Sequence, residues 1–293
     1  MHPKPSPRGL TMLDIAVGSY GEVPEHPVHR SMAPRGADVA PDTVDMGYIL
    51  NAKTDVWSDN VVELYEEAVA RQWSATRDIP WGELQELPDD VEHAMCQLCT
   101  VLTEVEMIAA DLPAKWMWRM SHDFIEAKMF LCMQIMDEAR HAEVFRKRAL
   151  SNGGGLLISR TAPTDVEKRI LRMCMQDEAR HVAYGTMHLR YAIEKDPDVA
   201  EEIHEALDHG ESVLIDFGSA PDISSALAML LPGGADDIEK KGFPLAQKLS
   251  KKQLTSYLAR CERAGISRPE RTTIPLDLLG IDPESIRPAG VAT

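Results

Sequence analysis

The sequence is poor in aromatic residues and in positive charge, and each shortage narrows the choice of function. Aromatic side chains make up 5% of the chain, whereas methionine occurs 15 times, which suits an adaptable helical interior. Lysine and arginine total 31 against 47 acidic residues, so the formal net charge is −16. A nucleic-acid partner is therefore not expected, because it would require a basic surface.

Long apolar runs are also missing. No segment reaches the roughly 18 consecutive apolar residues of a membrane span, and the proline-rich stretch from Met1 to Arg8 lacks the apolar core of a signal peptide. The five cysteines include one C-x-x-C pair, Cys96 and Cys99, and no second cysteine pair or adjacent histidine completes a zinc site. We therefore expect small buried thiols in a cytoplasmic protein with no membrane span.

The chain shows three regions of different composition. Residues 1–54 are rich in proline and glycine and predict a loosely ordered N-terminal arm. Residues 55–218 repeat apolar positions with a helical period and predict a helical bundle. Residues 219–293 predict a C-terminal extension with one or two helices, the clearest over 251–264. No strand pattern of consequence is present, so the predicted fold class is all-α.

Capping residues and helix breakers predict where the helices of the bundle begin and end. The caps expected at the helix starts are, in chain order, one of Ser58, Asp59 and Asn60; Asp89 or Asp90; Ser121 or Asp123; Thr164, in a capping box with Glu167; and the segment 196–198. The first helix should end near Ser74, the third in the run 151–155, and the last near Phe217. Pro113 should kink or interrupt the second helix.

A pentapeptide, Asp-Glu-Ala-Arg-His, occurs twice, from Asp137 to His141 and from Asp177 to His181. Helical residues three positions apart lie on one face, so Glu138 sits beside His141 and Glu178 beside His181. Each pair can hold a metal ion. Two inward-facing Glu-x-x-His helices, with a further Glu from each of two other helices, build di-iron or di-manganese carboxylate sites in four-helix bundles.

Helix lengths favour a meeting of the two motifs. The 12 residues from Glu138 to Leu150 span about 18 Å, and the 14 residues from Thr164 to Glu178 span about 21 Å. If the intervening connection lets the two helices run antiparallel, the motifs meet at nearly the same height. The alternative is a pair of exposed acidic and basic helix faces.

The preceding helix must supply another carboxylate for such a site. Glu106 and Glu104 are the candidates, and helical geometry alone leaves both open. Trp73, Trp116 and Trp118 are expected to be packing anchors.

These motifs resemble the ferritin-like di-metal carboxylate proteins, in the branch with ribonucleotide reductase small subunits, monooxygenases, N-oxygenases and ligand-binding oxidases. The resemblance is closest to the ligand-binding oxidases and N-oxygenases. It covers residues 57–191, and three stretches carry it: Cys99–Glu106, Gln134–Phe145 and Gln176–Thr186.

The resemblance implies a ligand set and a chemistry. The implied metal ligands are Glu106 (or Glu104), Glu138, His141, Glu178 and His181. Asp137 and Asp177 resemble carboxylates that hydrogen-bond the ligand imidazoles. The implied cofactor is two iron ions, or manganese plus iron, because the donors suit these metals and thiolates for zinc are missing. Dioxygen and a small organic substrate would be the reactants, with an electron-donor protein as a partner.

Two departures from the family narrow this expectation. Only 13 residues, 151–163, separate the two Glu-x-x-His helices, and they contain no Glu, so one core helix and its ligand are missing. A homodimer could cover the apolar surface this exposes. Phe145 stands where radical-storing reductases carry tyrosine, which argues against radical storage. The alternative function is an iron-binding, iron-storage or degenerate non-catalytic protein.

Overall fold

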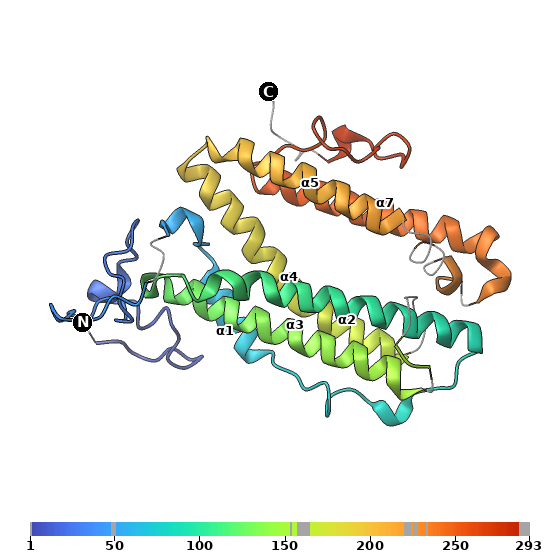
Figure 1. Cartoon of the computed structure of the whole chain (residues 1–293), viewed down its shortest axis with the longest axis horizontal. Coiled ribbons are helices and arrows are strands. Elements are labelled where there is room, and N and C mark those ends of the chain that lie inside the picture. The colour runs from blue at the N-terminus through green and yellow to red at the C-terminus, as the bar shows by residue number, and fades with distance from the viewer. Residues whose placement is uncertain are drawn as a thin grey trace. The chain divides into compact units, whose positions relative to one another are not determined.

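The computed structural model describes residues 2–47, 51–152, 154–156, 165–219, 224, 228–232 and 234–286. The prediction of an all-α protein is confirmed: within these residues the only extended pairing is an isolated bridge between Ser6 and Gly9. The main helices are α1 (Val61–Ala70), α2 (Asp89–Met117), α3 (Ile125–Ser151), α4 (Asp165–Lys195), α5 (Val199–Ser219) and α7 (Phe243–Arg263) (Figure 1).

Several helix ends agree with the capping signals. α2 begins at Asp89, and α3 ends at Ser151 at the start of the glycine run. A 3-10 turn, His122–Phe124, precedes α3, and the Ser121 hydroxyl caps it by accepting a hydrogen bond from the Asp123 backbone N–H. Thr164 and the side chain of Glu167, the expected capping box, lie outside the described residues.

Other helix ends differ from the prediction. α1 ends at Ala70, four residues before Ser74. Pro113 does not end α2, which continues to Met117. Pro113 lies about one turn before the end of the helix, and the backbone N–H that it lacks costs α2 only one hydrogen bond near its terminus, so the helix continues past it. α7 begins eight residues before Lys251, at Phe243, with Pro244 in its first turn, where proline lacks no needed donor.

The chain divides into two compact units, and each draws on three stretches of sequence. The first unit comprises residues 1–73, 108–139 and 176–197. Its core joins α1, the start of α3 and the end of α4. The buried members of this core are Val56, Trp57, Val61, Val62, Leu64, Met120, Phe124, Ala127, Phe130, Leu131 and Tyr191.

The N-terminal arm has no long helix among its described residues, and its side chains attach it to the first unit. The buried Arg35 guanidinium forms two hydrogen bonds with Glu126, at 2.9 and 2.5 Å. Tyr20 donates its hydroxyl to the same carboxylate at 3.1 Å. The backbone N–H of Val28 donates to Asp123 at 3.0 Å. The arm is therefore held at the beginning of α3.

The second unit comprises residues 74–107, 140–175 and 198–293. A buried ion pair between Glu92 and Arg148, at 2.8 Å, joins α2 to α3. α5 and α7 lie side by side (Figure 1), and the Tyr257 hydroxyl of α7 donates to Glu211 of α5 at 2.7 Å. Buried aliphatic residues between 274 and 286 cover Leu258 on α7. The C-terminal region therefore has its own small core.

None of the helices in the described part of the chain combines the length and the apolarity that crossing a membrane requires.

Candidate metal centre

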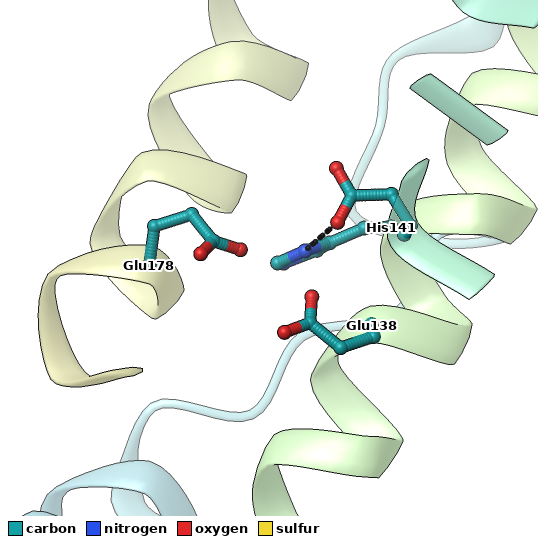
Figure 2. Close-up of side chains that lie close together, drawn as sticks. Glu138, His141 and Glu178 are labelled. Atoms are coloured by element: carbon teal, nitrogen blue, oxygen red, sulfur yellow. Dashed lines mark ion pairs between the residues drawn. The ribbon is translucent and has the colours of Figure 1, made fainter. Parts of the chain in front are cut away.

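Four side chains from three helices gather at one place. Glu106 comes from α2, Glu138 and His141 from α3, and Glu178 from α4. Each offers one ligand atom, and these four atoms all lie within 4.8 Å of one another. Figure 2 shows the carboxylates of Glu138 and Glu178 directed towards the His141 imidazole. His141 Nδ1 lies 3.5 Å from Glu106 Oε2. The structure thus brings together four of the five residues considered as metal ligands.

The fifth residue, His181, contacts two members of this group. Its Nδ1 lies 3.1 Å from Glu138 Oε1 and 3.4 Å from Glu178 Oε2. Glu138 and Glu178 therefore have an imidazole from each pentapeptide nearby. These two carboxylates therefore lie close to both histidines, His141 and His181.

The structure separates the two candidates on α2. Glu106 is partly buried within the group, whereas Glu104 is exposed and takes no part in it. Two residues correspond to a rotation of about 200° around a helix, so the two side chains point in nearly opposite directions. Glu104 is therefore not the carboxylate that α2 brings to this centre.

The pentapeptides are not solvated faces. Glu138 is 1% exposed and His141 is fully buried. Only Glu178 is open, with 43% of its side chain exposed. Carboxylates grouped in a poorly solvated place are costly unless cations or hydrogen bonds compensate their charge. The donor set of three carboxylates and imidazole nitrogen fits the needs of a bound cation.

Without a metal, His181 itself can supply positive charge. Burial lowers the pKa of this imidazole, but hydrogen bonds with Asp137, Glu138 and Glu178 outweigh burial and raise the pKa to about 11. The imidazolium then neutralises part of the carboxylate charge. A metal ion placed beside Nδ1 would replace this proton, because a histidine ligand must be neutral.

The aspartates that precede the two glutamates form a layer behind the centre. Asp137 Oδ2 lies 3.3 Å from His181 Nε2, so this aspartate holds the ring nitrogen that faces away from the carboxylates. The Arg180 guanidinium donates to Asp137 at 3.0 Å and to Asp177 at 2.6 Å. All three of these supporting side chains are buried. Arg180 therefore links the two pentapeptides through their aspartates.

Two supporting residues were not foreseen. Gln72 donates its amide to Asp137 at 3.3 Å, and the indole N–H of Trp73 donates to Asp177 at 2.8 Å. These consecutive residues after α1 thus each contact one of the two aspartates. The expected packing role of Trp73 omitted this hydrogen bond. The sequence offered one general reason to expect a polar partner for Trp73: an indole N–H that is removed from water requires a hydrogen-bond acceptor.

Comparison of the chain with protein-family models, with curated proteins and with solved structures finds no match.

Proposed function

We propose that this protein is a ferritin-like di-metal carboxylate oxidoreductase that uses dioxygen to oxidise a small organic substrate. The observation that carries the proposal is the group formed by Glu106, Glu138, His141 and Glu178, with ligand atoms within 4.8 Å of one another. Carboxylates and imidazoles drawn from several bundle helices are the ligands that such di-metal proteins use. Iron, or manganese with iron, suits these donors better than zinc.

The arrangement suggests how two ions would be shared. Glu106 and His141 would hold one ion, and His181 would hold the other. Glu138 and Glu178 lie near both imidazoles and would contribute carboxylate oxygens to hold both ions. Bound iron or manganese would supply one-electron redox changes and a place for dioxygen to be reduced.

The protein's own groups prepare these ligands. Asp137 faces Nε2 of His181 and keeps the proton on that nitrogen in the neutral ring, which leaves the Nδ1 lone pair directed at Glu138 and Glu178. His141 also presents Nδ1 to a carboxylate, that of Glu106. The partly exposed Glu178 marks the side from which reactants reach the centre. Oxygen insertion into a substrate consumes electrons from outside, so an electron-donor protein belongs to the proposal.

Iron loading tests the proposal directly. Metal-depleted protein is given Fe(II) without oxygen, its iron content is measured, and oxygen is then added while the absorption spectrum is recorded. We expect two iron ions per chain and a new near-ultraviolet absorption band. Glu138→Gln should bind less than half as much iron. Glu143→Gln is the matched control, because Glu143 lies on the same helix with an exposed side chain paired to Lys147. Less than one iron per chain in the unaltered protein, with no spectral change, would overturn the proposal.

A single-ion site is the second candidate function, and one observation favours it. The four residues of the compact group can surround one ion, whereas His181 lies outside this group. An iron-binding protein without turnover would then bind one ion per chain and consume no oxygen beyond that needed to oxidise it. The same loading experiment distinguishes this outcome by stoichiometry.

A further inference from the structure

Beyond His181, α4 carries three more rings on the same side of the helix. Tyr184, His188 and Tyr191 follow His181 at three, seven and ten positions, so the four side chains fall within about 80° of one another around the helix. Tyr184 and His188 stack, with ring centroids 5.9 Å apart and ring planes inclined by 8°. One stripe of α4 thus leads from the candidate metal centre towards the end of the helix.

This stripe contacts one short segment, residues 53–57, which we call the junction segment. The Tyr184 hydroxyl donates to the backbone carbonyl of Val56, and the distance between the two oxygens is 2.8 Å. Nδ1 of His188 lies 2.8 Å from the backbone carbonyl oxygen of Trp57. Consecutive carbonyls of the junction segment therefore hold consecutive turns of α4.

Lys53 joins the junction segment to the N-terminal arm. Its ammonium lies 5.4 Å from the centre of the Trp57 ring and 5.6 Å from the centre of the Tyr191 ring. Its backbone N–H donates to the Glu25 carbonyl at 2.8 Å, and its ammonium lies 3.7 Å from the Glu25 carboxylate. The junction segment is thus attached to the arm at one side and to the stripe on α4 at the other.

Phe130 of α3 connects this stripe to the His181 imidazole. The phenyl ring is buried, and its centroid lies 4.8 Å from the centroid of the Tyr184 ring. It lies 6.5 Å from the centroid of the His181 ring, in an edge-on arrangement with an angle of 72° between the ring planes. The terminal torsion of a histidine side chain is broad, so neighbouring groups decide how the ring is oriented. Phe130 therefore helps to fix the orientation of the imidazole.

We propose that the junction segment positions His181 for metal binding through Tyr184 and Phe130, so that the N-terminal arm regulates the metal affinity of the centre. The proposal rests on the proposed function in one respect, because it takes His181 as a metal ligand. A shift of the junction segment moves the Tyr184 ring, and the packed Phe130 ring transmits this shift to the imidazole, since a close-packed interior transmits strain. By thermodynamic linkage, a bound metal ion must in turn hold the junction segment more firmly.

Titration of the metal-depleted full chain with Mn(II) tests the coupling, with the free ion measured by its electron paramagnetic resonance signal. Phe130→Leu removes the ring beside His181 and should weaken Mn(II) binding about tenfold. Tyr184→Phe keeps the ring but loses the hydrogen bond to the Val56 carbonyl, and should weaken binding about threefold. Tyr257→Phe is the matched control, because it removes a tyrosine hydroxyl that donates to Glu211 in the second unit, and it should leave Mn(II) affinity unchanged. Circular dichroism checks that each variant is folded.

A double variant and hydrogen exchange then test the route. Phe130→Leu/Tyr184→Phe should bind Mn(II) as weakly as Phe130→Leu alone, because two changes that act through the same contact are not additive. In the unaltered protein, saturating Mn(II) should slow hydrogen exchange of the backbone amides of the junction segment, and Phe130→Leu should abolish this slowing.

The outcomes separate this coupling from the proposed function. Equal Mn(II) affinities in Tyr184→Phe and Tyr257→Phe would overturn the coupling and leave the metal centre in place. The same conclusion would follow if the two losses of affinity multiplied in the double variant, or if Mn(II) left hydrogen exchange of the junction segment unchanged. An unaltered protein that binds no Mn(II) would overturn both the coupling and the proposed function.

Discussion

At the scale of single residues, the buried aspartates and Arg180 explain how the candidate ligand side chains are held. Arg180 joins Asp137 to Asp177, and the residues after α1 donate to both aspartates. Polar groups behind a metal ligand fix its orientation and its basicity, and their loss costs 10- to 100-fold in metal affinity. The proposed chemistry therefore depends on side chains that touch no metal.

Trp73→Phe tests this dependence. Phenylalanine keeps most of the ring packing but lacks the N–H that donates to Asp177. We expect Mn(II) or Fe(II) affinity to fall by about tenfold or more, measured by titration of the metal-free protein. Trp81→Phe is the control, because it removes an indole N–H that serves only the Ala75 carbonyl. Equal affinities in the two variants would contradict the positioning role of Trp73.

A second residue-scale prediction concerns acid. Burial raises the pKa of Glu211, but hydrogen bonds from Arg268, Tyr257 and Thr272 outweigh burial and lower it. The folded state thus binds this proton less tightly than the unfolded state does. The stabilisation is fully present above the unfolded pKa, near 4.5, and is lost as the pH falls through the lowered folded value.

Glu211→Gln should remove this stabilisation. At neutral pH we expect the free energy of unfolding to fall by about 3 kcal/mol, because the fully buried Arg268 loses an ionic partner. Urea unfolding at pH 7 and pH 4 measures the effect, and the difference from the unaltered protein should be smaller at pH 4. The exposed neighbouring pair is the control: Glu201→Gln, which affects Arg271, should change little. If the loss of unfolding free energy caused by Glu211→Gln were larger at pH 4 than at pH 7, the pKa of Glu211 would not be lowered in the folded protein.

At the scale of elements, the N-terminal arm depends on one buried ion pair. The carboxylate of Glu126 accepts from Arg35 and from Tyr20, and the arm's backbone donates to Asp123. Arg35→Ala should leave Glu126 buried without its guanidinium, which costs about 3–5 kcal/mol. Because this cost is avoided when the arm detaches, we expect proteases to cut within residues 2–47 much faster.

The matched control for the arm is Arg30→Ala. Arg30 pairs with Asp45 at 3.3 Å, but both side chains are about half exposed, so this pair stabilises little. The cleavage rate of this variant should stay near that of the unaltered protein. If Arg30→Ala and Arg35→Ala are cut equally fast, the buried pair does not hold the arm.

The element scale also shows what a sequence can predict here. Local signals predicted the start of α2 near Asp89 or Asp90 and the end of α3 within residues 151–155, close to the observed ends, because caps and glycine act within a few residues. The i, i+3 spacing paired Glu138 with His141 for the same reason. The choice between Glu104 and Glu106 required tertiary information, since both lie beside apolar residues. Periodicity likewise did not show that Trp116 and Trp118 would each be more than half exposed, so the prediction that these two side chains are packing anchors is wrong.

Contacts distant in sequence account for the remaining differences. Gln72 and Trp73 reach Asp137 and Asp177 across 65 and 104 positions, a pairing that no local pattern encodes. α7 begins at Phe243, directly after a π-helical turn, Ile238–Gly242, and both lie before residue 251, where the sequence predicted this helix to begin. These features depend on contacts between residues distant in sequence, and the local sequence pattern does not identify which residues make those contacts.

At the scale of the whole molecule, a net charge of −16 and a largely buried group of carboxylates lead us to expect that bound cations stabilise the folded chain. An ion that binds the folded chain alone stabilises it, by about 2.7 kcal/mol at a hundred times its dissociation constant. For a chain of this size we expect the melting temperature of metal-depleted protein to rise by roughly 5 °C with excess Mn(II). Glu138→Gln should lose most of this rise, whereas Glu143→Gln, altered at an exposed position of the same helix, should keep it. Equal rises in both variants would place the stabilising ion elsewhere, because a cation held by the outer surface charge would not require Glu138.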